Sequence, residues 1–319
     1  MSRVVPITVG IATRSRPAQL ARCLDAVLGG TVLPAEVLVV DQSRDEATTA
    51  VVRQRAATSR VAVRCVRQLA DGLSRSRNAV IGHATTNIVA VTDDDCVPDV
   101  HWVEVLAREL EADSTLDAVA GRVLPLGPER DDLVAVSSRT SERRRDHVGE
   151  APPWLVGTGA NFAARTARLR ALGAYDVRLG VGSAGRAGED MDMIHRLLRD
   201  GARIRFEPDA IVYHERQPLA QRANSRLTYG HGIGACCGLW AREGDPYAAV
   251  ALVRWVGMRL GTLARALRGG DRRRAREEVD VLRGTASGLV YGLRAPARSN
   301  AATVETEARM PHGEHGAIP

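Results

Sequence analysis

The sequence predicts an α/β protein, in which a mostly parallel central sheet flanked by helices is followed by a C-terminal helical extension. Short apolar runs alternate with helix-spaced stretches of about a dozen residues, as they do in βαβ units. Polar residues directly follow several of these runs. After residue 215 the alternation gives way to an arginine-rich pattern with helical spacing. We therefore expect a domain over 1–215, a helical extension over 216–296, and a disordered tail over 297–319.

The first half of the chain is expected to form strand–helix units. Each expected strand is a short run of apolar and β-branched residues, and each expected helix repeats apolar residues every three or four positions. Pro17 suits the first turn of the first helix. The expected strands are 4–12, 36–40, 61–66 and 88–91, and the expected helices are 17–28, 47–57, 71–84 and one that opens at 98.

The second half can be interpreted in the same way as far as residue 214. The segment 127–150 is polar and charged, and we expect a mobile loop or a weak helix there. Residues 175–188 contain four glycines and predict a loop that is too long for a simple turn. Further strands are expected at 119–124, 203–206 and 210–213, and further helices at 163–172 and 189–199.

The composition fits a folded protein of ordinary polarity. Of 319 residues, 45% are hydrophobic and 26% are charged. The net charge is +6, and the sequence contains arginine but no lysine. Five cysteines form no CxxC pair, which favours a reducing compartment. The N-terminus resembles a strand rather than a signal peptide, and no apolar stretch is long enough to span a bilayer. We therefore expect a cytoplasmic protein.

Three consecutive acids, Asp93, Asp94 and Asp95, follow the expected strand 88–91. Adjacent carboxylates repel one another, and burial adds a desolvation penalty to their ionised forms. A divalent cation relieves both costs, and oxygen ligands suit Mg²⁺ or Mn²⁺. A solvated turn or a helix N-cap is the plainer explanation of such a cluster.

Other strand ends favour a ligand site. The carboxyl ends of parallel strands meet at one edge of a sheet, where such proteins bind their ligands. Polar residues follow the first and second expected strands at this edge: Thr13, Arg14, Arg16, Asp41 and Ser43. We infer that a nucleotide binds there.

A second acidic cluster opens the expected helix 189–199. Glu189, Asp190 and Asp192 would be stabilised there by the helix dipole alone. The glycine-rich loop before them also suits a lid that delivers a carboxylate base to a reacting hydroxyl. His214 follows the last strand and is either structural or a metal ligand.

Six stretches, in this order, resemble the family 2 inverting glycosyltransferases, which have the Rossmann-like GT-A fold. The resemblance covers about residues 5–214. The stretches are ITVGIATRSRP, VLVVDQS, GLSRSRNAVIGHA, IVAVTDDDC, GTGANFAARTARLRALGAYD and AGEDMDMIHRLLRDGARIRFEPDAIVYHE.

The resemblance implies a nucleotide-sugar donor and a divalent metal, Mg²⁺ or Mn²⁺. It implies that Asp93, Asp95 and His214 bind the metal. Asp190 matches the catalytic base of the family, and Glu189 is the neighbouring candidate. Donor contacts are implied for Thr13, Arg14, Arg16, Asp41, Ser43, Arg77, Asn78, Asp93 and Asp94.

The acceptor site is the part of the sequence that is hardest to interpret. Trp154 could stack on an acceptor ring or belong to the core. Gly159 would let the backbone approach a sugar closely, and Asn161 could hydrogen-bond it. The segments 127–150 and 175–188 are the expected acceptor loops.

The arginine-rich extension has several interpretations. The apolar helix expected at 248–268 could lie on an anionic membrane at the inner face of the plasma membrane. It could equally pack on the catalytic domain or on a second copy of the chain, as in a homodimer. Nucleic acid is not expected as a partner, because no recognised module accompanies the charge. Four arginines interrupt the helix: Arg254, Arg259, Arg265 and Arg268.

These observations predict a metal-dependent inverting glycosyltransferase. It would move a sugar from a UDP- or dTDP-linked donor to a hydroxyl of a polysaccharide, glycolipid or secondary-metabolite acceptor. A nucleotidyltransferase is one alternative, but it would carry a glycine-rich basic signature after the first strand, and 13–16 lacks glycine. A catalytically silent nucleotide-sugar-binding scaffold at the membrane is another, and the intact acids argue against it.

Overall fold

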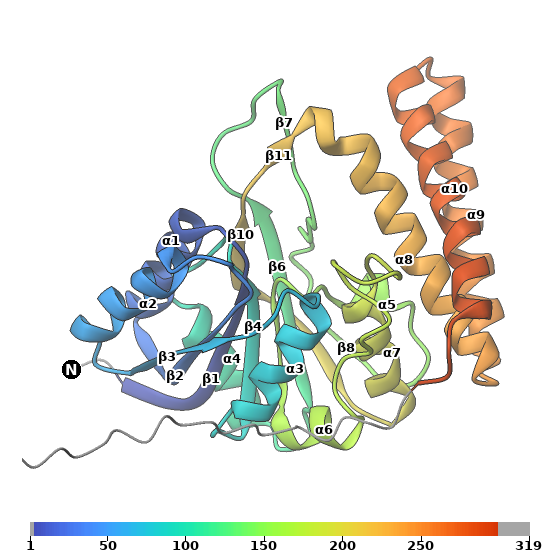
Figure 1. Cartoon of the computed structure of the whole chain (residues 1–319). Coiled ribbons are helices and arrows are strands. Elements are labelled where there is room, and N and C mark those ends of the chain that lie inside the picture. The colour runs from blue at the N-terminus through green and yellow to red at the C-terminus, as the bar shows by residue number, and fades with distance from the viewer. Residues whose placement is uncertain (1–2, 299–319) are drawn as a thin grey trace, which may run out of the picture.

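The computed structural model of the protein describes residues 3–298, in which a nine-stranded sheet lies between helices (Figure 1). The strands of this sheet are β1 Arg3–Thr13, β2 Val32–Asp41, β3 Ala62–Arg67, β4 Ile88–Asp93, β5 Cys96–Pro98, β6 Ala118–Pro125, β8 Arg145–His147, β9 Phe162–Arg165 and β10 Ile204–His214. Their order is β3-β2-β1-β4-β9-β6-β10-β5, and β8 pairs with β10. Only β5, β8 and β9 run against the direction of the others. The expected α/β class with a mostly parallel sheet is confirmed.

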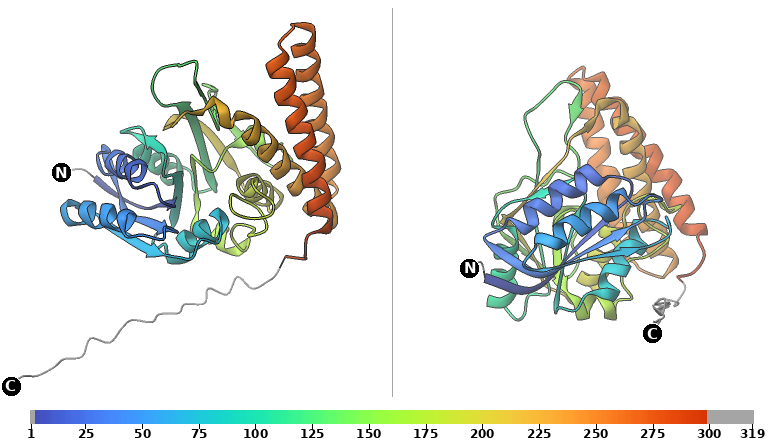
Figure 2. Two further views of the ribbon diagram at one scale, coloured as in Figure 1. Left: turned by 45° about the horizontal axis from the view of Figure 1, so that its top comes forward. Right: turned by 60° about the vertical axis from the view of Figure 1, so that its left-hand side comes forward.

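Helices cover both faces of the sheet (Figure 2). The helices are α1 Pro17–Leu28, α2 Ala47–Thr58, α3 Leu73–His83, α4 Trp102–Ala112, α5 Pro153–Val156, α6 Thr166–Ala171, α7 Glu189–Arg199, the 3₁₀ turn η1 Leu219–Gln221, α8 Arg222–Arg242, α9 Tyr247–Arg268 and α10 Arg272–Arg294. One core contains Leu20 of α1 and Trp102 of α4, and the other contains Val80 of α3 and Ile194 of α7. The sheet therefore separates two hydrophobic layers.

Strand register brings the polar strand ends together. Thr13 lies opposite Asp41 on β2, and Ala12 lies opposite Asp93 on β4. β5 follows β4 after a tight turn and pairs antiparallel with β10, which sets Cys96 opposite His214. Residues from five strands therefore meet at one edge of the sheet.

The predicted helix at 163–172 is wrong in its first part. Phe162–Arg165 form β9, which inserts antiparallel between β4 and β6, and helix α6 begins only at Thr166. Small residues such as Ala163 and Ala164 suit a helix locally, but here both are buried between two strands. Tertiary packing therefore overrides the local preference of this segment.

One other expectation is corrected at the far side of the sheet. The strands expected at 203–206 and 210–213 form one strand, β10, with an irregular register between Glu207 and Ile211. The segment 127–150 is mostly loop, one of the two alternatives expected for it, and it contains the short strands β7 (Leu133–Val134) and β8. β7 pairs with β11 (Gln217–Pro218) in a separate two-stranded sheet.

A buried carboxylate, Glu36 of β2, joins three segments of the fold. Its Oε1 accepts hydrogen bonds from the Thr8 hydroxyl (2.6 Å) and from the Thr85 amide and hydroxyl (2.8 Å each). Arg64 donates to its other oxygen. Burial alone would raise the pKa of Glu36, but these hydrogen bonds outweigh burial and lower the pKa to about 2.

We expect Glu36 to make the fold sensitive to acid. Its pKa rises to about 4.3 on unfolding, so the ionised group stabilises the fold above that pH and loses this contribution as pH falls toward about 2. The difference corresponds to about 3 kcal/mol. Chemical denaturation of the wild type and Glu36→Gln at neutral and acidic pH checks this. The variant should be less stable than the wild type at neutral pH, and the difference in their free energies of unfolding should shrink in acid. A difference of equal size at both pH values would contradict the stabilising role of the ionised Glu36.

Glycines let α8 and α10 pack closely. Gly230, Gly234 and Gly238 of α8 recur every four residues, as do Gly284, Gly288 and Gly292 of α10. A Cβ on Gly234 would collide with the Thr285 carbonyl oxygen, and a Cβ on Gly288 with the His231 carbonyl oxygen. The glycines of these two helices therefore form a close helix–helix contact.

We expect Gly234→Ala to destabilise the protein by about 1–3 kcal/mol through overpacking. Gly257 on α9 is the matched control, because a Cβ there meets nothing within 4 Å. Gly257→Ala should stabilise the helix by up to about 1 kcal/mol. Thermal or chemical denaturation measures both changes, and equal effects of the two substitutions would contradict close packing of α8 on α10.

A third core joins the extension to the rest of the protein. It contains Trp154, Leu179 and Met191 together with Trp240 and Trp255 from α8 and α9. The domain division at residue 215 therefore stays a prediction. Among residues 3–298, no helix combines the length and apolar character needed to cross a membrane.

The expected tail at 297–319 falls almost entirely outside the described residues. Within them, Arg298 donates hydrogen bonds to the carbonyl oxygens of Gly173 (2.9 Å) and Ala174 (3.1 Å). The chain therefore returns to the loop after α6 at this point.

Candidate active site

One cavity of about 190 Å³, here called the α7 cavity, collects the central site residues. It lies between strand ends, the loop 175–188 and the beginning of α7. Of the residues predicted from the sequence it includes Arg77, Asp93, Gly159, Glu189 and Asp190. Its other lining residues are Leu73, Ser137, Thr158, Ala160, Val181, Ala187, Gly188 and Tyr229.

The loop after β1 is tied to the acid triplet. The Thr13 hydroxyl donates to Asp94 Oδ2 (2.7 Å), and Arg16 donates to Asp94 Oδ1 (3.1 Å) and Asp95 Oδ2 (3.0 Å). Burial raises the pKa of Asp94 to about 6, although the Thr13 hydrogen bond and the Arg16 charge oppose this. Asp94 thus holds the loop, on which Arg14 is exposed. Direct donor contacts by this loop and by Asp94 stay predictions.

Asp41 and Ser43 join the loops after β1 and β2. Asp41 has no exposed surface, and its Oδ1 accepts a hydrogen bond from the Ser43 amide (2.8 Å). The Ser43 hydroxyl oxygen accepts from the Ser15 amide (2.7 Å). Ser15 has a positive φ of 54°, a conformation that few residues other than glycine adopt. This network shapes the edge of the sheet, and a contact of Asp41 with a nucleotide base stays a prediction.

Asp93, Asp95, Cys96 and His214 form a group that could hold a metal ion, since donor atoms from all four lie within 4.8 Å of one another. His214 Nδ1 lies 2.8 Å from the Glu215 carbonyl oxygen, which can only accept, so Nδ1 carries the proton of the neutral ring. Nε2 then presents its lone pair near Asp95 Oδ1, 3.6 Å away. Burial, reinforced by the charges of Asp93 and Asp95, raises the pKa of the Cys96 thiol well above its usual range. Two carboxylates and one imidazole are therefore the suitable donors, and they fit Mg²⁺ or Mn²⁺.

A buried arginine connects the strand ends with α7. Arg77 donates to Asp93 Oδ1 (2.9 Å) and to Glu189 Oε1 (2.8 Å). Burial would lower the pKa of Arg77, but the charges of Asp93 and Glu189 raise it, so the guanidinium stays charged. A Cβ on Gly159 would collide with this guanidinium. The glycine predicted to admit a sugar therefore admits Arg77.

Asp190 is the carboxylate of α7 that is most open to the cavity. It is half-buried, whereas Glu189 is 7% exposed. One Asp190 oxygen accepts from the Gly159 amide (2.8 Å), and the other accepts from the Met191 amide (2.8 Å). These bonds fix its orientation, and each oxygen keeps a further lone pair. Asp190 can therefore accept a proton from a group in the cavity.

The other two acids of α7 are less suited to act as a base. Asp192 is buried away from the cavity and accepts hydrogen bonds from Arg196 (2.8 Å) and Trp240 (2.9 Å). Glu189 is paired with Arg77; burial and the charge of Asp190 raise its pKa, whereas Arg77 lowers it. The geometry thus favours Asp190 over Glu189 and Asp192.

Two residues expected at the acceptor site lie in the core instead. Trp154 is 7% exposed and packs edge-to-face on Trp255, with ring centroids 5.2 Å apart. Asn161 has no exposed surface, and its amide bonds the Trp102 indole and two backbone carbonyl oxygens, all at 2.8 Å. Neither side chain is available to a sugar. The core alternative therefore holds for Trp154, and the sugar contact expected of Asn161 is wrong.

Asn78 is also turned away from the α7 cavity. Its Nδ2 donates to the Tyr175 carbonyl (2.9 Å), and its Oδ1 accepts from the Tyr175 amide (2.7 Å). Farther along the loop 175–188, the Val181 carbonyl accepts from the Leu73 amide (2.8 Å). Asn78 therefore anchors the glycine-rich loop to α3 instead of lining the donor site.

The structure adds three residues that sequence reasoning missed. Cys96 joins the metal-type group through the pairing of β5 with β10, a contact that its place in the sequence does not reveal. Ser137 and Tyr229 line the α7 cavity from segments far along the chain. Burial and the charge of Asp190 raise the pKa of the Tyr229 phenol, which places this ring near the candidate base.

A mostly parallel sheet with acids at its carboxyl edge and a second carboxylate across the same cavity is the arrangement expected of a GT-A glycosyltransferase. Residues 8–165 match the family described as Glycosyl transferase family 2, and this part of the chain belongs to that family.

Two relatives bear glycosyltransferase names. The pre-mycofactocin glycosyltransferase of Mycobacterium tuberculosis is 30% identical over 202 residues, which cover 60% of this chain and 41% of the relative. The chain therefore spans less than half the length of that relative. The glucosyl-dolichyl phosphate glucuronosyltransferase of Haloferax volcanii is 24% identical over 234 residues, 66% of this chain and 69% of the relative.

The fold is similar to that of a solved mannosyltransferase. The structure of PcManGT from Pyrobaculum calidifontis, in complex with GDP-Man and Mn²⁺, matches with a TM-score of 0.60 and 18% identity. The match covers 89% of this chain and 87% of the other. This likeness confirms the expected GT-A architecture.

Proposed function

We propose that this chain is a metal-dependent inverting glycosyltransferase that moves a sugar from a nucleoside diphosphate to an acceptor hydroxyl. One observation carries the proposal. Asp93, at the strand ends, and Asp190, at the start of α7, line the same cavity, and Arg77 contacts Asp93 from within it. Such a cavity can hold the reacting sugar between a diphosphate and a base.

The donor would lie at the strand ends. A divalent cation held by Asp93, Asp95 and His214 would neutralise the charge that develops on the departing diphosphate. Arg77 stays charged beside Asp93 and offsets negative charge at the same place. Arg16 fixes the position of Asp95 through a 3.0 Å hydrogen bond. The proposed donor is a UDP- or dTDP-linked sugar.

Asp190 would act as the general base. Its carboxylate takes the proton of the acceptor hydroxyl while that oxygen bonds to the anomeric carbon. The bond from this carbon to the diphosphate oxygen breaks, and its electron pair leaves with the nucleotide. Because attack and departure occur on opposite faces of the sugar, the anomeric configuration inverts. A second carboxylate, as retaining glycoside hydrolysis uses, is not required.

The similar proteins support glycosyl transfer as the reaction class, and experiments must identify the substrates. The two relatives are named as glycosyltransferases, and the solved mannosyltransferase was bound to GDP-Man and Mn²⁺. A polysaccharide, glycolipid or secondary metabolite is the proposed acceptor.

Product analysis tests the proposal. The full chain is incubated with UDP-, dTDP- and GDP-sugars in Mn²⁺ or in EDTA. We expect Mn²⁺-dependent release of the nucleoside diphosphate from one donor class, and a product with inverted anomeric configuration by NMR. Retention of configuration would contradict the single displacement, and release in EDTA would contradict the role of the metal.

We further propose that α9 contacts an anionic membrane surface. Val253, Leu260 and Leu267 are spaced seven residues apart and are 71%, 50% and 63% exposed. α9 carries no acidic residue, and three of its arginines, Arg254, Arg265 and Arg268, are exposed. Two copies of this face would bring like charges together, whereas anionic lipid headgroups complement them.

Replacing Leu260 with serine is expected to weaken binding to vesicles of phosphatidylcholine with phosphatidylglycerol by about 10–100-fold, because a membrane-buried leucine contributes about 1.5–3 kcal/mol. Vesicle sedimentation measures the loss, and vesicles of phosphatidylcholine alone are the control. A dimer in sedimentation velocity that Leu260→Ser dissociates would instead assign this face to a second copy.

A further inference from the structure

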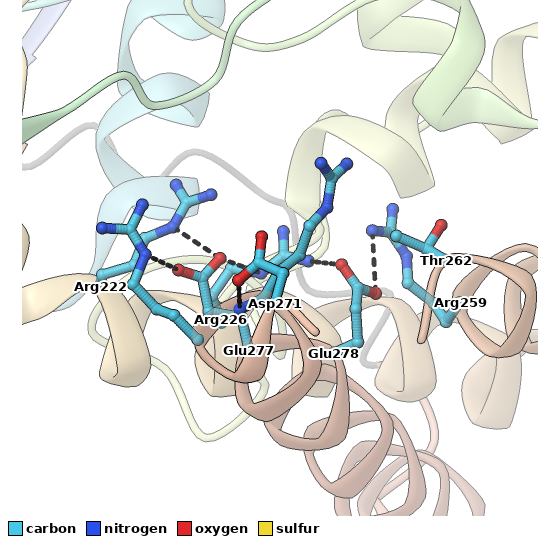
Figure 3. A pocket seen from close by; sticks show the side chains of 9 residues that line it. Arg222, Arg226, Arg259, Thr262, Asp271, Glu277 and Glu278 are labelled. Atoms are coloured by element: carbon cyan, nitrogen blue, oxygen red, sulfur yellow. Dashed lines mark hydrogen bonds and ion pairs between the residues drawn. The ribbon is translucent and has the colours of Figure 1, made fainter. Parts of the chain in front are cut away.

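A second cavity, of about 420 Å³, lies where α8, α9 and α10 meet (Figure 3). All of its lining side chains are polar, and five of them are arginines that face three carboxylates. We call it the arginine pocket. It is lined by Arg222, Arg226, Arg259, Thr262, Asp271, Arg273, Arg274, Glu277 and Glu278.

The carboxylates do not balance the arginines of this pocket. Glu278 is shared by Arg226 (2.6 Å) and Arg259 (3.5 Å). Glu277 is likewise shared, by Arg222 (3.2 Å) among others. The third carboxylate, Asp271, caps α10. An excess of positive charge therefore remains in the arginine pocket.

Two donor groups in the arginine pocket are buried without an acceptor. Within residues 3–298, neither Arg226 Nε nor Arg259 Nε has a hydrogen-bond partner, although both atoms are shielded from solvent. Leaving such donors unsatisfied is costly. A phosphate-type group offers several strong acceptor oxygens, and the guanidinium fork matches their spacing. The chemistry of the pocket therefore fits such an anion.

The arginine pocket adjoins the side of the α7 cavity that contains the candidate base. Tyr229, which lines the α7 cavity, follows Arg226 by three residues on α8. Ser137 also lines the α7 cavity, and the carbonyl of Ala135, two residues earlier, accepts from Arg222 (3.2 Å). Two separate segments thus connect the two cavities.

We propose that the arginine pocket binds a phosphate-type group of the acceptor while the acceptor hydroxyl lies at Asp190. This inference rests on the proposed glycosyl transfer and narrows the acceptor to a class that carries an anionic phosphoester. A phospholipid headgroup and a water-soluble phosphoester offer the same chemistry.

Binding of inorganic phosphate to the full chain without added metal tests the pocket directly. Arg259→Gln is the test variant, because Arg226 still pairs with Glu278 when Arg259 is replaced. Arg268→Gln, on an exposed position of the same helix outside the arginine pocket, is the matched control. We expect Arg259→Gln to weaken phosphate binding by about tenfold or more, and Arg268→Gln to leave it unchanged.

Two probes, one a membrane vesicle and the other a soluble phosphoester, identify the source of the phosphate group. If Arg259→Gln, and not Arg268→Gln, weakens binding to vesicles of phosphatidylcholine with phosphatidate, the group is a lipid headgroup. If it weakens binding of glycerol phosphate alone, the group belongs to a soluble acceptor. Both results support the arginine pocket.

Mn²⁺-dependent nucleotide binding is measured on the same samples and keeps the two proposals apart. Suppose that nucleotide binding is intact, but that phosphate does not bind or binds wild type and Arg259→Gln equally. This result would overturn the phosphate-binding role of the arginine pocket and leave the transferase proposal standing. Absent nucleotide binding in a folded wild type would instead count against the proposed transferase function.

Discussion

Replacing Asp190 with asparagine is expected to lower turnover by about 10²–10⁴-fold, the usual contribution of a general base. Asparagine keeps the shape of the side chain and can still accept one of the hydrogen bonds that Gly159 and Met191 donate. It cannot take a proton from the acceptor hydroxyl. Mn²⁺-dependent nucleotide affinity should stay within a factor of about two, because no donor contact is assigned to Asp190.

Steady-state kinetics and nucleotide binding of the same preparations separate these effects. Asp192→Asn is the matched control, because Asp192 lies two residues along α7 and contacts Arg196 and Trp240 in the core. That variant should lose stability and retain the turnover of folded enzyme. Normal turnover by Asp190→Asn would remove Asp190 from the role of base and leave Glu189 as the candidate.

Replacing Asp95 with alanine is expected to remove the effect of Mn²⁺ on both nucleotide binding and turnover. Loss of an outer-shell partner costs about 10–100-fold in metal affinity, and loss of a direct ligand should exceed that. The change also removes one acceptor of Arg16 and the neighbour of His214 Nε2. Titration of Mn²⁺ into the protein, with and without nucleotide, measures the loss.

Cys96→Ala is the control for the metal group. The Cys96 sulfur lies within the same group of donor atoms, but burial raises the pKa of its thiol well above its usual range, which disfavours the thiolate as a ligand. Alanine there should leave Mn²⁺ affinity nearly unchanged. A loss equal to that of Asp95→Ala would make the thiolate a metal ligand and correct the donor set assigned to this site.

The sequence predicts those parts of the site that depend on local pattern. Asp93–95 and Thr13 follow apolar strands, and parallel strands bring such ends together, as the register of Thr13 with Asp41 confirms. The bounds of α7, Glu189–Arg199, match the prediction, because its acidic start, apolar spacing and flanking glycines are all local signals.

Side chains whose role depends on distant partners could not be assigned in this way. The sequence allows Trp154 to contact an acceptor or to lie in the core, and it allows Asn161 to bond a sugar. Contacts with Trp255 and Trp102 place both residues in the core. Tyr229 reaches the α7 cavity only because α8 packs against α7. Such contacts join residues far apart in the sequence, which periodicity and spacing do not encode.

Calorimetric titration of UDP, dTDP and GDP, each with and without Mn²⁺, tests the central proposal most directly. We expect one nucleotide, UDP or dTDP, to bind the folded chain tightly in Mn²⁺ and much more weakly in EDTA, because Asp93, Asp95 and His214 reach the diphosphate only through the metal. Affinity that is equal in Mn²⁺ and EDTA, or no binding of any nucleotide to folded protein, would contradict a metal-dependent nucleotide-sugar transferase.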